Sequence, residues 1–319
     1  MHTSGIKRPV AASLAALTLV ITAACAGSGG GGATPSPDGS VTPTTSAARA
    51  DVLAVKIDNV APARPPTGLE NADLVYVEQV EAGLSRILAA YSSDVPSVIG
   101  PVRSARETDL ELLRQFDKPT LAYSGAQSRL LPSIEAAPLD PLPPSKAPNA
   151  YFRSPDRAAP HNLYLRPEKI PHDSTDVNAA EDIGLRFAAA PAGGTPVDER
   201  TVAYPSARFT FTWSADSGRW LIGMDGSPAR TASGERLGTA NVLLQNVDVH
   251  PSRFRDRGGN TTPFTETVGS GSARVLRDGT AYDVSWERDT AASATEFTTN
   301  DGKPMTFADG QIWIVFVPK

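Results

Sequence analysis

The sequence is nearly free of cysteine, and this excludes several kinds of site. Cys25 is the only cysteine among 319 residues, so the chain has no disulfide framework, no zinc site built on several thiolates and no cysteine nucleophile with downstream partners. It also lacks the nucleophile elbow G-x-S-x-G, the zinc motif H-E-x-x-H and the phosphate-binding loop G-x-x-x-x-G-K-[ST]. The signatures of several common enzyme classes are therefore missing.

Charge and histidine content exclude further classes. The 35 acidic residues outnumber the 30 lysines and arginines, which gives a net charge of −5 and no cationic field for nucleic acid. His161, His172 and His250 stand alone in the sequence without metal-ligand spacing, so we expect no metal and no cofactor. With 40% hydrophobic and 20% charged residues, the chain is expected to be a soluble globular protein.

Residues 1–25 have the features of a lipoprotein signal peptide. Lys7 and Arg8 precede a mostly apolar stretch that is shorter than the ~20 residues of a membrane span. Cys25 follows small residues, as in a bacterial lipobox, although Thr22 replaces the usual leucine. We expect lipidation of Cys25 and anchoring by acyl chains on the extracytoplasmic face of the cell membrane. The alternative is an ordinary signal peptide with an incidental thiol.

Residues 26–50 are expected to form a disordered linker. Gly, Ser, Thr and Pro fill 17 of these 25 positions, and such a composition buries too little apolar surface to offset chain entropy. A flexible coil of this length spans roughly 25–30 Å. It would hold a folded part away from a membrane surface.

A mixed α/β module is predicted over residues 51–192. Short apolar runs predict strands, a Ser-x-x-Glu spacing that begins at Ser104 predicts a capped helix, and further helices are predicted over 127–136 and 177–189. Eight prolines within 132–160 predict a long surface loop without regular structure. The predicted strands are 52–57, 74–77, 87–91 and 120–123.

Residues 200–319 are predicted to form a β-rich module. Apolar residues there alternate with a period of two between Gly-containing turns, and the last run, 312–317, is apolar on both faces and should be a central strand. All four tryptophans lie in this module, and we favour core packing over sugar stacking for them. The prediction is a sandwich or barrel here and an α+β fold overall.

Polar residues near a predicted hairpin indicate a site in the first module. If Ala82 and Gly83 form a two-residue turn, Gln79 pairs with Arg86, while Glu81 and Arg86 lie on a diagonal of the same face. A buried ion pair between Glu81 and Arg86 would suit this geometry.

Arg103, Ser104 and Arg106 flank the start of the predicted capped helix. Backbone N–H groups, the helix dipole and two guanidinium groups would converge there, which is suited to holding a phosphate or carboxylate. The alternative is that the arginines only balance the acidic residues of the helix, which are Glu107, Asp109 and Glu111.

Two further segments complete the predicted site. His161 and Asn162 end the proline-rich loop, where a histidine can transfer protons near neutral pH and an asparagine can orient a substrate or a turn. Asp58 and Asn59 close the first strand, and Arg64 follows. The structural alternatives are an idle loop histidine and an Asp-Asn turn.

Distinctive motifs occur in both modules. They are 55–59, 64–65, 68–69, 72–76, Glu78, 80–81, Arg86, 100–106, 160–164, 269–273, 278–279, Trp286 and 310–314. Together they resemble the YerB-like family of bacterial lipoproteins, and the resemblance covers the chain from about residue 51 to its end. It implies an extracytoplasmic, lipid-anchored protein of two modules without a defined biochemical role.

A looser resemblance is to the LytR-CpsA-Psr glycopolymer phosphotransferases, whose arginines grip a polyprenyl pyrophosphate. It rests on the order of Arg86 on a strand, Arg103 and Arg106 after a strand, and then 124–125. The aspartate that helps to hold Mg²⁺ in that family has no counterpart after Arg86 or Arg103. Phosphoryl transfer would therefore lack part of its electrostatic clamp.

We expect a lipid-anchored envelope protein that binds an anionic envelope component through an arginine-lined cleft. The arginines of this cleft are Arg64, Arg86, Arg103 and Arg106. As a transferase or hydrolase instead, the protein would use Glu78 or Glu81 and His161 for acid–base catalysis. A third interpretation is a scaffold that binds another protein through a sheet edge of the second module.

Overall fold

The structure is a computed structural model of the chain. It describes residues 51–170, 177–256 and 258–319. The predicted signal peptide 1–25, the lipidation of Cys25 and the linker 26–50 lie outside the described residues. Within the described ranges, no helix combines the length and apolar character needed to cross a membrane.

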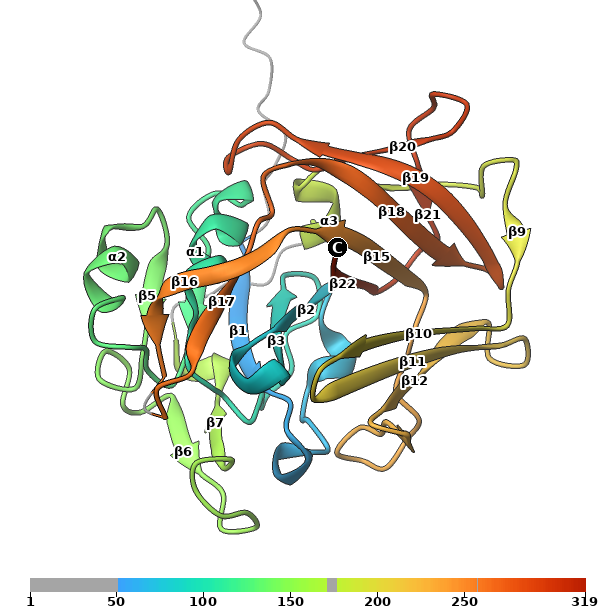
Figure 1. Cartoon of the computed structure of the whole chain (residues 1–319). Coiled ribbons are helices and arrows are strands. Elements are labelled where there is room, and N and C mark those ends of the chain that lie inside the picture. The colour runs from blue at the N-terminus through green and yellow to red at the C-terminus, as the bar shows by residue number, and fades with distance from the viewer. Residues whose placement is uncertain (1–50, 171–176, 257) are drawn as a thin grey trace, which may run out of the picture. The chain divides into compact units, whose positions relative to one another are not determined.

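One long sheet runs through the described part of the chain (Figure 1). Eleven strands of the described residues form it, in the order β20-β19-β18-β15-β22-β2-β3-β1-β4-β5, with β9 paired to β19. The strands of the two chain halves meet where β2 pairs in parallel with β22. The bounds are β1 Leu53–Asp58, β2 Leu74–Gln79, β3 Ser85–Tyr91, β4 Thr120–Ala122, β5 Asp140–Leu142, β9 Thr195–Pro196, β15 Asn241–Val247, β18 Gly269–Arg277, β19 Thr280–Arg288, β20 Glu296–Thr299 and β22 Ile312–Pro318.

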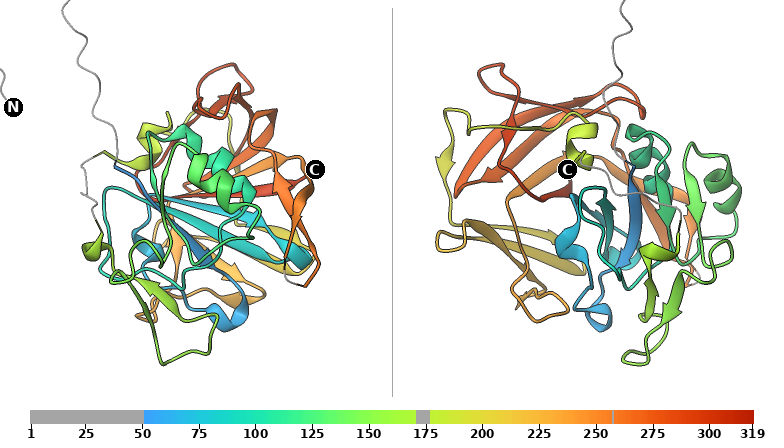
Figure 2. Two further views of the ribbon diagram at one scale, coloured as in Figure 1. Left: turned by 90° about the vertical axis from the view of Figure 1, so that its left-hand side faces the viewer. Right: turned by 180° about the vertical axis from the view of Figure 1, so that it is seen from behind.

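Different layers cover the two faces of this sheet, as Figures 1 and 2 show from three sides. Helices and the β16–β17 hairpin cover one face, where Leu112, Ile134 and Phe254 join the core. The β10–β12 layer covers the other face, where the Trp313 ring centroid lies 6.3 Å from that of Phe209. The covering elements are α1 Glu107–Leu112, α2 Leu131–Ala136, α3 Ala179–Asp182, β10 Glu199–Tyr204, β11 Ala207–Ser214, β12 Arg219–Met224, β13 Ser227–Pro228, β14 Gly238–Thr239, β16 Val249–Arg255 and β17 Thr261–Thr265.

Short elements connect these layers. β6 and β7 form a hairpin, and β8 pairs in parallel with β21. Several single turns of 3-10 helix precede or follow the strands. The bounds are β6 Tyr151–Arg153, β7 Leu163–Leu165, β8 Arg186–Phe187 and β21 Thr306–Phe307, with 3-10 turns at Ala61–Ala63, Leu69–Asn71, Glu81–Gly83, Leu113–Gln115 and Pro167–Lys169.

The predicted α+β fold is confirmed, with a mixed first half and a strand-rich second half. The four predicted strands of the first half are β1 to β4, and the closing run is the central strand β22, between β15 and β2. The second half supplies both the β10–β12 layer and strands of the long sheet beneath it, which gives a sandwich-like packing. The segments predicted as modules, 51–192 and 200–319, therefore share one sheet.

The start of the first helix differs from the prediction. α1 begins at Glu107, and Arg106 rather than Ser104 is its N-cap. The reason is that the Asp109 carboxylate accepts a hydrogen bond from the Arg106 N–H at 2.7 Å. A carboxylate two residues beyond the predicted one therefore closes the first turn.

The other two helices are shorter than predicted, and the proline-rich loop contains strands. Within 127–136 only α2 is helical, because the Gln127 side chain accepts hydrogen bonds from the N–H groups two and three residues later and holds a turn. Within 177–189 only α3 is helical, and Gly184 at φ 87° follows its end. The stretch 132–160 contains β5 and β6. Proline is tolerated in β5 because this strand lies at the sheet edge.

The β2–β3 hairpin has a register that differs from the predicted one. Its turn contains three residues, 81–83, rather than two. Glu78 therefore faces Arg86, while Gln79 faces Ser85. Because side chains alternate along a strand, Gln79 points to the opposite face from Arg86.

Candidate functional site

Three charged residues form a row across β2, β3 and β1. Arg86 on β3 lies directly opposite Glu78 on β2 and Asp58 on β1. Lys56 shares their face, because it lies two residues before Asp58. All four are buried, and the next residues along this face, such as Leu88, belong to the apolar core beneath the helices. These four charged side chains therefore lie at one end of the apolar core beneath the helices.

Lys56 is fully buried between two carboxylates. Its Nζ donates to Oε1 of Glu78 and, at 2.6 Å, to Oδ1 of Asp109 on α1. Burial raises the pKa of Glu78, the Lys56 charge lowers it and the Asp109 charge raises it, with a net upward shift. These contacts attach α1 to the ends of β1 and β2.

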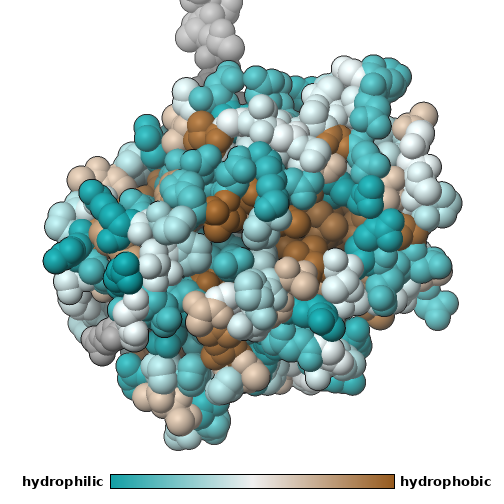
Figure 3. Space-filling view, in the orientation of Figure 1, coloured by the Kyte–Doolittle hydropathy of each residue, from teal (hydrophilic) through white to brown (hydrophobic). Residues whose placement is uncertain are grey.

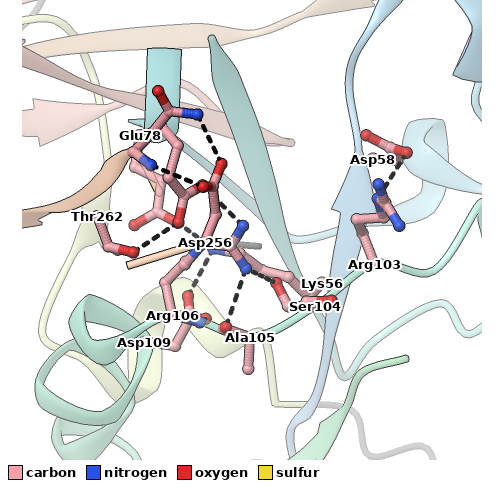
Figure 4. Close-up of polar contacts among 12 residues, drawn as sticks. Lys56, Asp58, Glu78, Arg103, Ser104, Ala105, Arg106, Asp109, Asp256 and Thr262 are labelled. Atoms are coloured by element: carbon pink, nitrogen blue, oxygen red, sulfur yellow. Dashed lines mark hydrogen bonds and ion pairs between the residues drawn. The ribbon is translucent and has the colours of Figure 1, made fainter. Parts of the chain in front are cut away.

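Asp58 bridges Arg103 and His161. Its Oδ2 lies 2.8 Å from Nδ1 of His161 and 3.0 Å from Nε of Arg103. Its Oδ1 is buried and has no hydrogen-bond partner in the described part of the chain. The side chains of Arg103 and His161 are 26% and 22% exposed, so both reach the surface. Figure 4 shows Arg103 directed toward Asp58.

Arg106 is held by the turn after β2 and by its own segment. Its Nη2 donates to Oε2 of Glu81 at 2.7 Å, and its Nη1 donates to the carbonyl oxygens of Ser104 and Ala105 at 3.0 and 3.1 Å. Thr262 of β17 donates to the other Glu81 carboxylate oxygen at 2.6 Å (Figure 4). The second half of the chain therefore fixes the carboxylate that orients Arg106.

The Glu81→Gln variant is expected to lose stability mainly at pH values where Glu81 is ionised. Burial alone would raise the pKa of Glu81, but the hydrogen bond and charge of Arg106 and the hydrogen bond from Thr262 lower it overall. A carboxyl group with a lowered folded pKa contributes stability above its unfolded pKa, and this contribution is lost as pH falls through the folded value. Melting temperatures of both proteins should differ at neutral pH and converge in acid. An equal difference at both ends of that range would contradict this account.

Arg86 lies at the centre of the row and has no direct partner among the described residues. The residue is 6% exposed, yet its guanidinium makes no hydrogen bond or ion pair with any residue that the structure describes. Burial lowers the pKa of Arg86 to about 10, the charges of Arg106 and Arg103 lower it too, and Asp58 and Glu81 partly offset this. We call Arg86, Arg103 and Arg106 the arginine cluster.

The arginine cluster is suited to binding an anion. Each guanidinium has five N–H donors in a planar fork that matches the oxygens of phosphate and carboxylate. Within the cluster, Asp58 neutralises Arg103 and Glu81 neutralises Arg106, which leaves Arg86 as the unpaired charge. Among residues 51–170, 177–256 and 258–319, no group of three or more potential ligands is placed to hold a metal ion.

Arg64 and Asn59, both predicted at this site, lie on the other face of the sheet. Asn59 donates to Oγ of Ser85 at 2.9 Å. Arg64 donates to Asn59 and, at 2.7 Å, to Asp225 after β12. Because Asn59 and Ser85 are sequence neighbours of the row residues, they point away from the row. Arg64 therefore does not belong to the cleft in which the sequence placed it.

Ser104 lies between Arg103 and Arg106 in the sequence, and Asn162 follows His161, but the side chains of both make local contacts. The Asn162 side chain accepts from Arg153 at 2.7 Å and donates to the Ser154 carbonyl at 3.0 Å, which braces the β6–β7 hairpin. Oγ of Ser104 lies 3.5 Å from Oγ of Ser124. At the helix N-terminus, the Asp109 carboxylate already accepts the hydrogen bond of the Arg106 N–H group, so this N–H group is not free for a ligand.

Sequence reasoning did not identify Lys56, Asp109 or Thr262 as parts of the site. The position of Lys56, two residues before Asp58 in an otherwise apolar strand, is the signal that could have shown their shared face. In the alternative drawn from the sequence, Asp109 balances the charge of the arginines. In the structure its carboxylate accepts a hydrogen bond from Lys56. Thr262 lies 181 residues after Glu81 in the sequence, and no local sequence pattern identifies it as a partner of Glu81.

Comparisons with known proteins agree with the two chain halves. Residues 39–180 match the family described as "Protein of unknown function (DUF3048) N-terminal domain", and residues 200–314 match its C-terminal domain. The chain is 25% identical to "Putative lipoprotein YerB" of Bacillus subtilis (strain 168) over 291 residues, which cover 83% of this chain and 81% of that protein. It is similar in fold to the crystal structure of YerB, with a TM-score of 0.70 at 22% identity, over 85% of this chain and 92% of that one.

Proposed function

Because the chain belongs to the DUF3048 family, whose description assigns no function, we propose its role from the arginine cluster: it binds an anionic ligand that carries phosphate or carboxylate groups. The observation that carries this proposal is Arg86, a buried guanidinium without a direct anionic partner among the described residues. An unpaired buried charge is unfavourable, and a ligand anion would supply the missing partner. Arg103 and Arg106 are 26% and 14% exposed and would receive the ligand from solvent.

The proposed ligand is a component of the bacterial cell envelope. Support comes from the lipobox-like sequence before Cys25 and from a relative whose printed name is that of a lipoprotein. Lipidation of Cys25 would anchor the chain to the extracytoplasmic face of the cell membrane, and the linker 26–50 would let the folded unit reach envelope polymers.

Binding of defined polyanions tests the proposal. Isothermal titration would use poly(glycerol phosphate) and inorganic pyrophosphate as phosphate probes and polygalacturonate as the carboxylate probe, at low salt. A charge-assisted hydrogen bond contributes roughly 1.5–3 kcal/mol, so Arg86→Met should weaken binding by about tenfold or more. Arg103→Ala should also weaken it. The matched control is Arg230→Ala, because Arg230 is exposed and its Nη1 donates to the Gly234 carbonyl.

Two results would refute anion binding at this site. One is that none of the probes binds the wild-type chain. The other is that Arg86→Met and Arg230→Ala weaken binding equally, since this would indicate a diffuse surface charge effect. A preference for phosphate or carboxylate probes would identify the ligand group.

A transferase or hydrolase that uses this site is a second candidate, favoured by the contact between Asp58 and His161. A carboxylate that holds Nδ1 of a histidine leaves Nε2 to exchange a proton with a bound ligand. Glu78 and Glu81 are already engaged by basic side chains, so His161 would transfer the proton. Hydrolysis of bis(4-nitrophenyl) phosphate that is lost in His161→Asn and kept in Arg230→Ala would favour this function over binding alone.

A further inference from the structure

A groove lies on the face of the long sheet that is opposite the arginine cluster. It has a volume of about 1020 Å³ and runs between β10 and the parts of β15, β18, β19 and β22 that the β10–β12 layer leaves uncovered. Leu244 and Val317 form its apolar floor, and both pack against the core of that face. Figure 3 shows hydrophobic side chains gathered in a recess at this place, between β15 and β10 of Figure 1. We call it the β10 groove.

The wall of the β10 groove is an unpaired strand edge. Among the described strands, β10 pairs only with β11. The Trp213 N–H donates to the Asp198 carbonyl. In an antiparallel ladder only every second residue of a strand forms backbone hydrogen bonds with the neighbouring strand, so the bonds from β10 to β11 come from every second residue counted from Asp198. The backbone N–H and C=O groups of Thr201 and Ala203 therefore point away from β11, and both residues are exposed. β10 contains no proline and no bulge that would block pairing with another strand.

The β10 groove keeps one unbalanced positive charge. Nε of Arg274 lies 2.7 Å from the Asp283 carboxylate, so this pair is neutral. Arg200 also lines the groove, and its Nη1 donates only to the carbonyl oxygen of Glu199. No carboxylate among the described residues forms an ion pair with Arg200. A ligand of this groove would therefore gain from an acidic group near Arg200.

The lining of the groove favours a polypeptide over a glycan. No aromatic ring of the described residues lines it, so it offers no platform on which a sugar ring could stack. It offers instead a row of backbone N–H and C=O groups beside an apolar floor, which is how proteins recognise extended peptides.

We propose that the β10 groove binds an extended segment of a partner protein that carries an acidic residue. The segment adds as a strand to β10 and exchanges backbone hydrogen bonds with Thr201 and Ala203. Alternate side chains of the segment pack on Leu244 and Val317, and its acidic side chain meets Arg200. This site is separate from the anion site and does not depend on it.

Selection from a peptide library tests this proposal. Random peptides of about ten residues, displayed on phage, would be selected on the folded chain and counter-selected on the Ala203→Pro variant. Proline removes the outward N–H group and is tolerated at a sheet edge. The selected peptides should alternate apolar residues and contain an acidic residue. A synthetic selected peptide should bind Ala203→Pro about tenfold more weakly or worse.

Charge reversal provides a second readout with a matched control. Arg200→Glu should weaken binding of the acidic peptide and favour a version in which lysine replaces the acid. Arg208→Glu is the control, because Arg208 is exposed on β11 and does not line the groove. If Ala203→Pro fails to fold by circular dichroism, Thr201→Pro replaces it, since Thr201 also has an outward N–H group.

Four outcomes would overturn the proposal. These are the absence of enriched peptides, peptides that bind the folded proline variant as well as the wild type, and saturable binding of chitotetraose in the groove with no peptide binding. The fourth is a dimer in sedimentation that Ala203→Pro dissociates, since this would assign the edge to a second copy of the chain.

Discussion

The Lys56→Met variant is expected to unfold with a free energy about 3–5 kcal/mol lower than that of the native chain. Lys56 is fully buried, and its ammonium group contacts both Glu78 and Asp109. Methionine has a similar length and preserves the packing, but it leaves two carboxylates in the core with no cation between them. The melting temperature should fall by roughly 10 °C, as measured by circular dichroism.

Two further variants separate this effect from a general loss of a salt bridge. Lys146 pairs with Glu135 at 2.7 Å, but its side chain is 44% exposed, so Lys146→Met should cost less than about 1 kcal/mol. Adding Glu78→Gln to Lys56→Met should restore part of the stability, because one of the two orphaned carboxylates is removed. If Lys56→Met and Lys146→Met melted together, the buried ion group would not stabilise the fold.

The positions of the main strands can be predicted because each strand forms from one continuous segment of the sequence. Val52 to Ile57 is apolar except for Lys56, and Ile312 to Val317 is apolar without interruption; they become β1 and the central strand β22. Such runs must be buried on both faces wherever they lie. The α+β class follows from these runs and from the alternating pattern after residue 200, whatever the order of the strands in the sheet.

Helix ends and the hairpin register cannot be predicted in this way, because competing local hydrogen bonds decide them. Ser104 and Glu107 have the spacing of a capping box, yet Asp109 accepts the hydrogen bond that starts the helix. The turn at 81–83 contains one residue more than its Ala-Gly pair suggests. One extra residue moves Glu78, in place of Gln79, opposite Arg86.

The candidate site can be predicted in part from its residue types. Arg86 is separated in sequence from Arg103 and Arg106, yet in the fold the charges of both lower its pKa. The sequence contains no information on which carboxylate each arginine would meet, since Glu81 and Asp58 reach their partners through strand pairing. Arg64 looked equivalent by residue type, but the alternation of side chains along β1 places its contacts on the other face.

The Arg86→Met variant is expected to be more stable than the native chain by about 1–3 kcal/mol while it loses anion binding. Burial lowers the pKa of Arg86 to about 10, well below its ordinary value. One pKa unit corresponds to 1.36 kcal/mol, so the charged guanidinium costs about 3 kcal/mol at neutral pH. The pKa of Arg86 is lower in the folded chain than in the unfolded chain, so this cost to stability is complete below about pH 10. It declines only as pH rises through that value. Replacing Arg86 by methionine leaves no carboxylate without a cationic partner, since Asp58 still pairs with Arg103 and Glu81 still pairs with Arg106.

Arg288→Met is the matched control for this gain in stability. Arg288 is 1% exposed, but its guanidinium donates to Oγ1 of Thr267 and to the carbonyl oxygens of Glu111 and Ser293. Its loss leaves those acceptors unsatisfied and should destabilise the chain by about 3 kcal/mol or more. Urea unfolding would compare both variants with the native chain, with and without pyrophosphate. Pyrophosphate should raise the unfolding free energy of the native chain and of Arg288→Met, but not that of Arg86→Met. If Arg86→Met were as unstable as Arg288→Met, Arg86 would be a satisfied structural residue, and it would need no ligand anion as a partner.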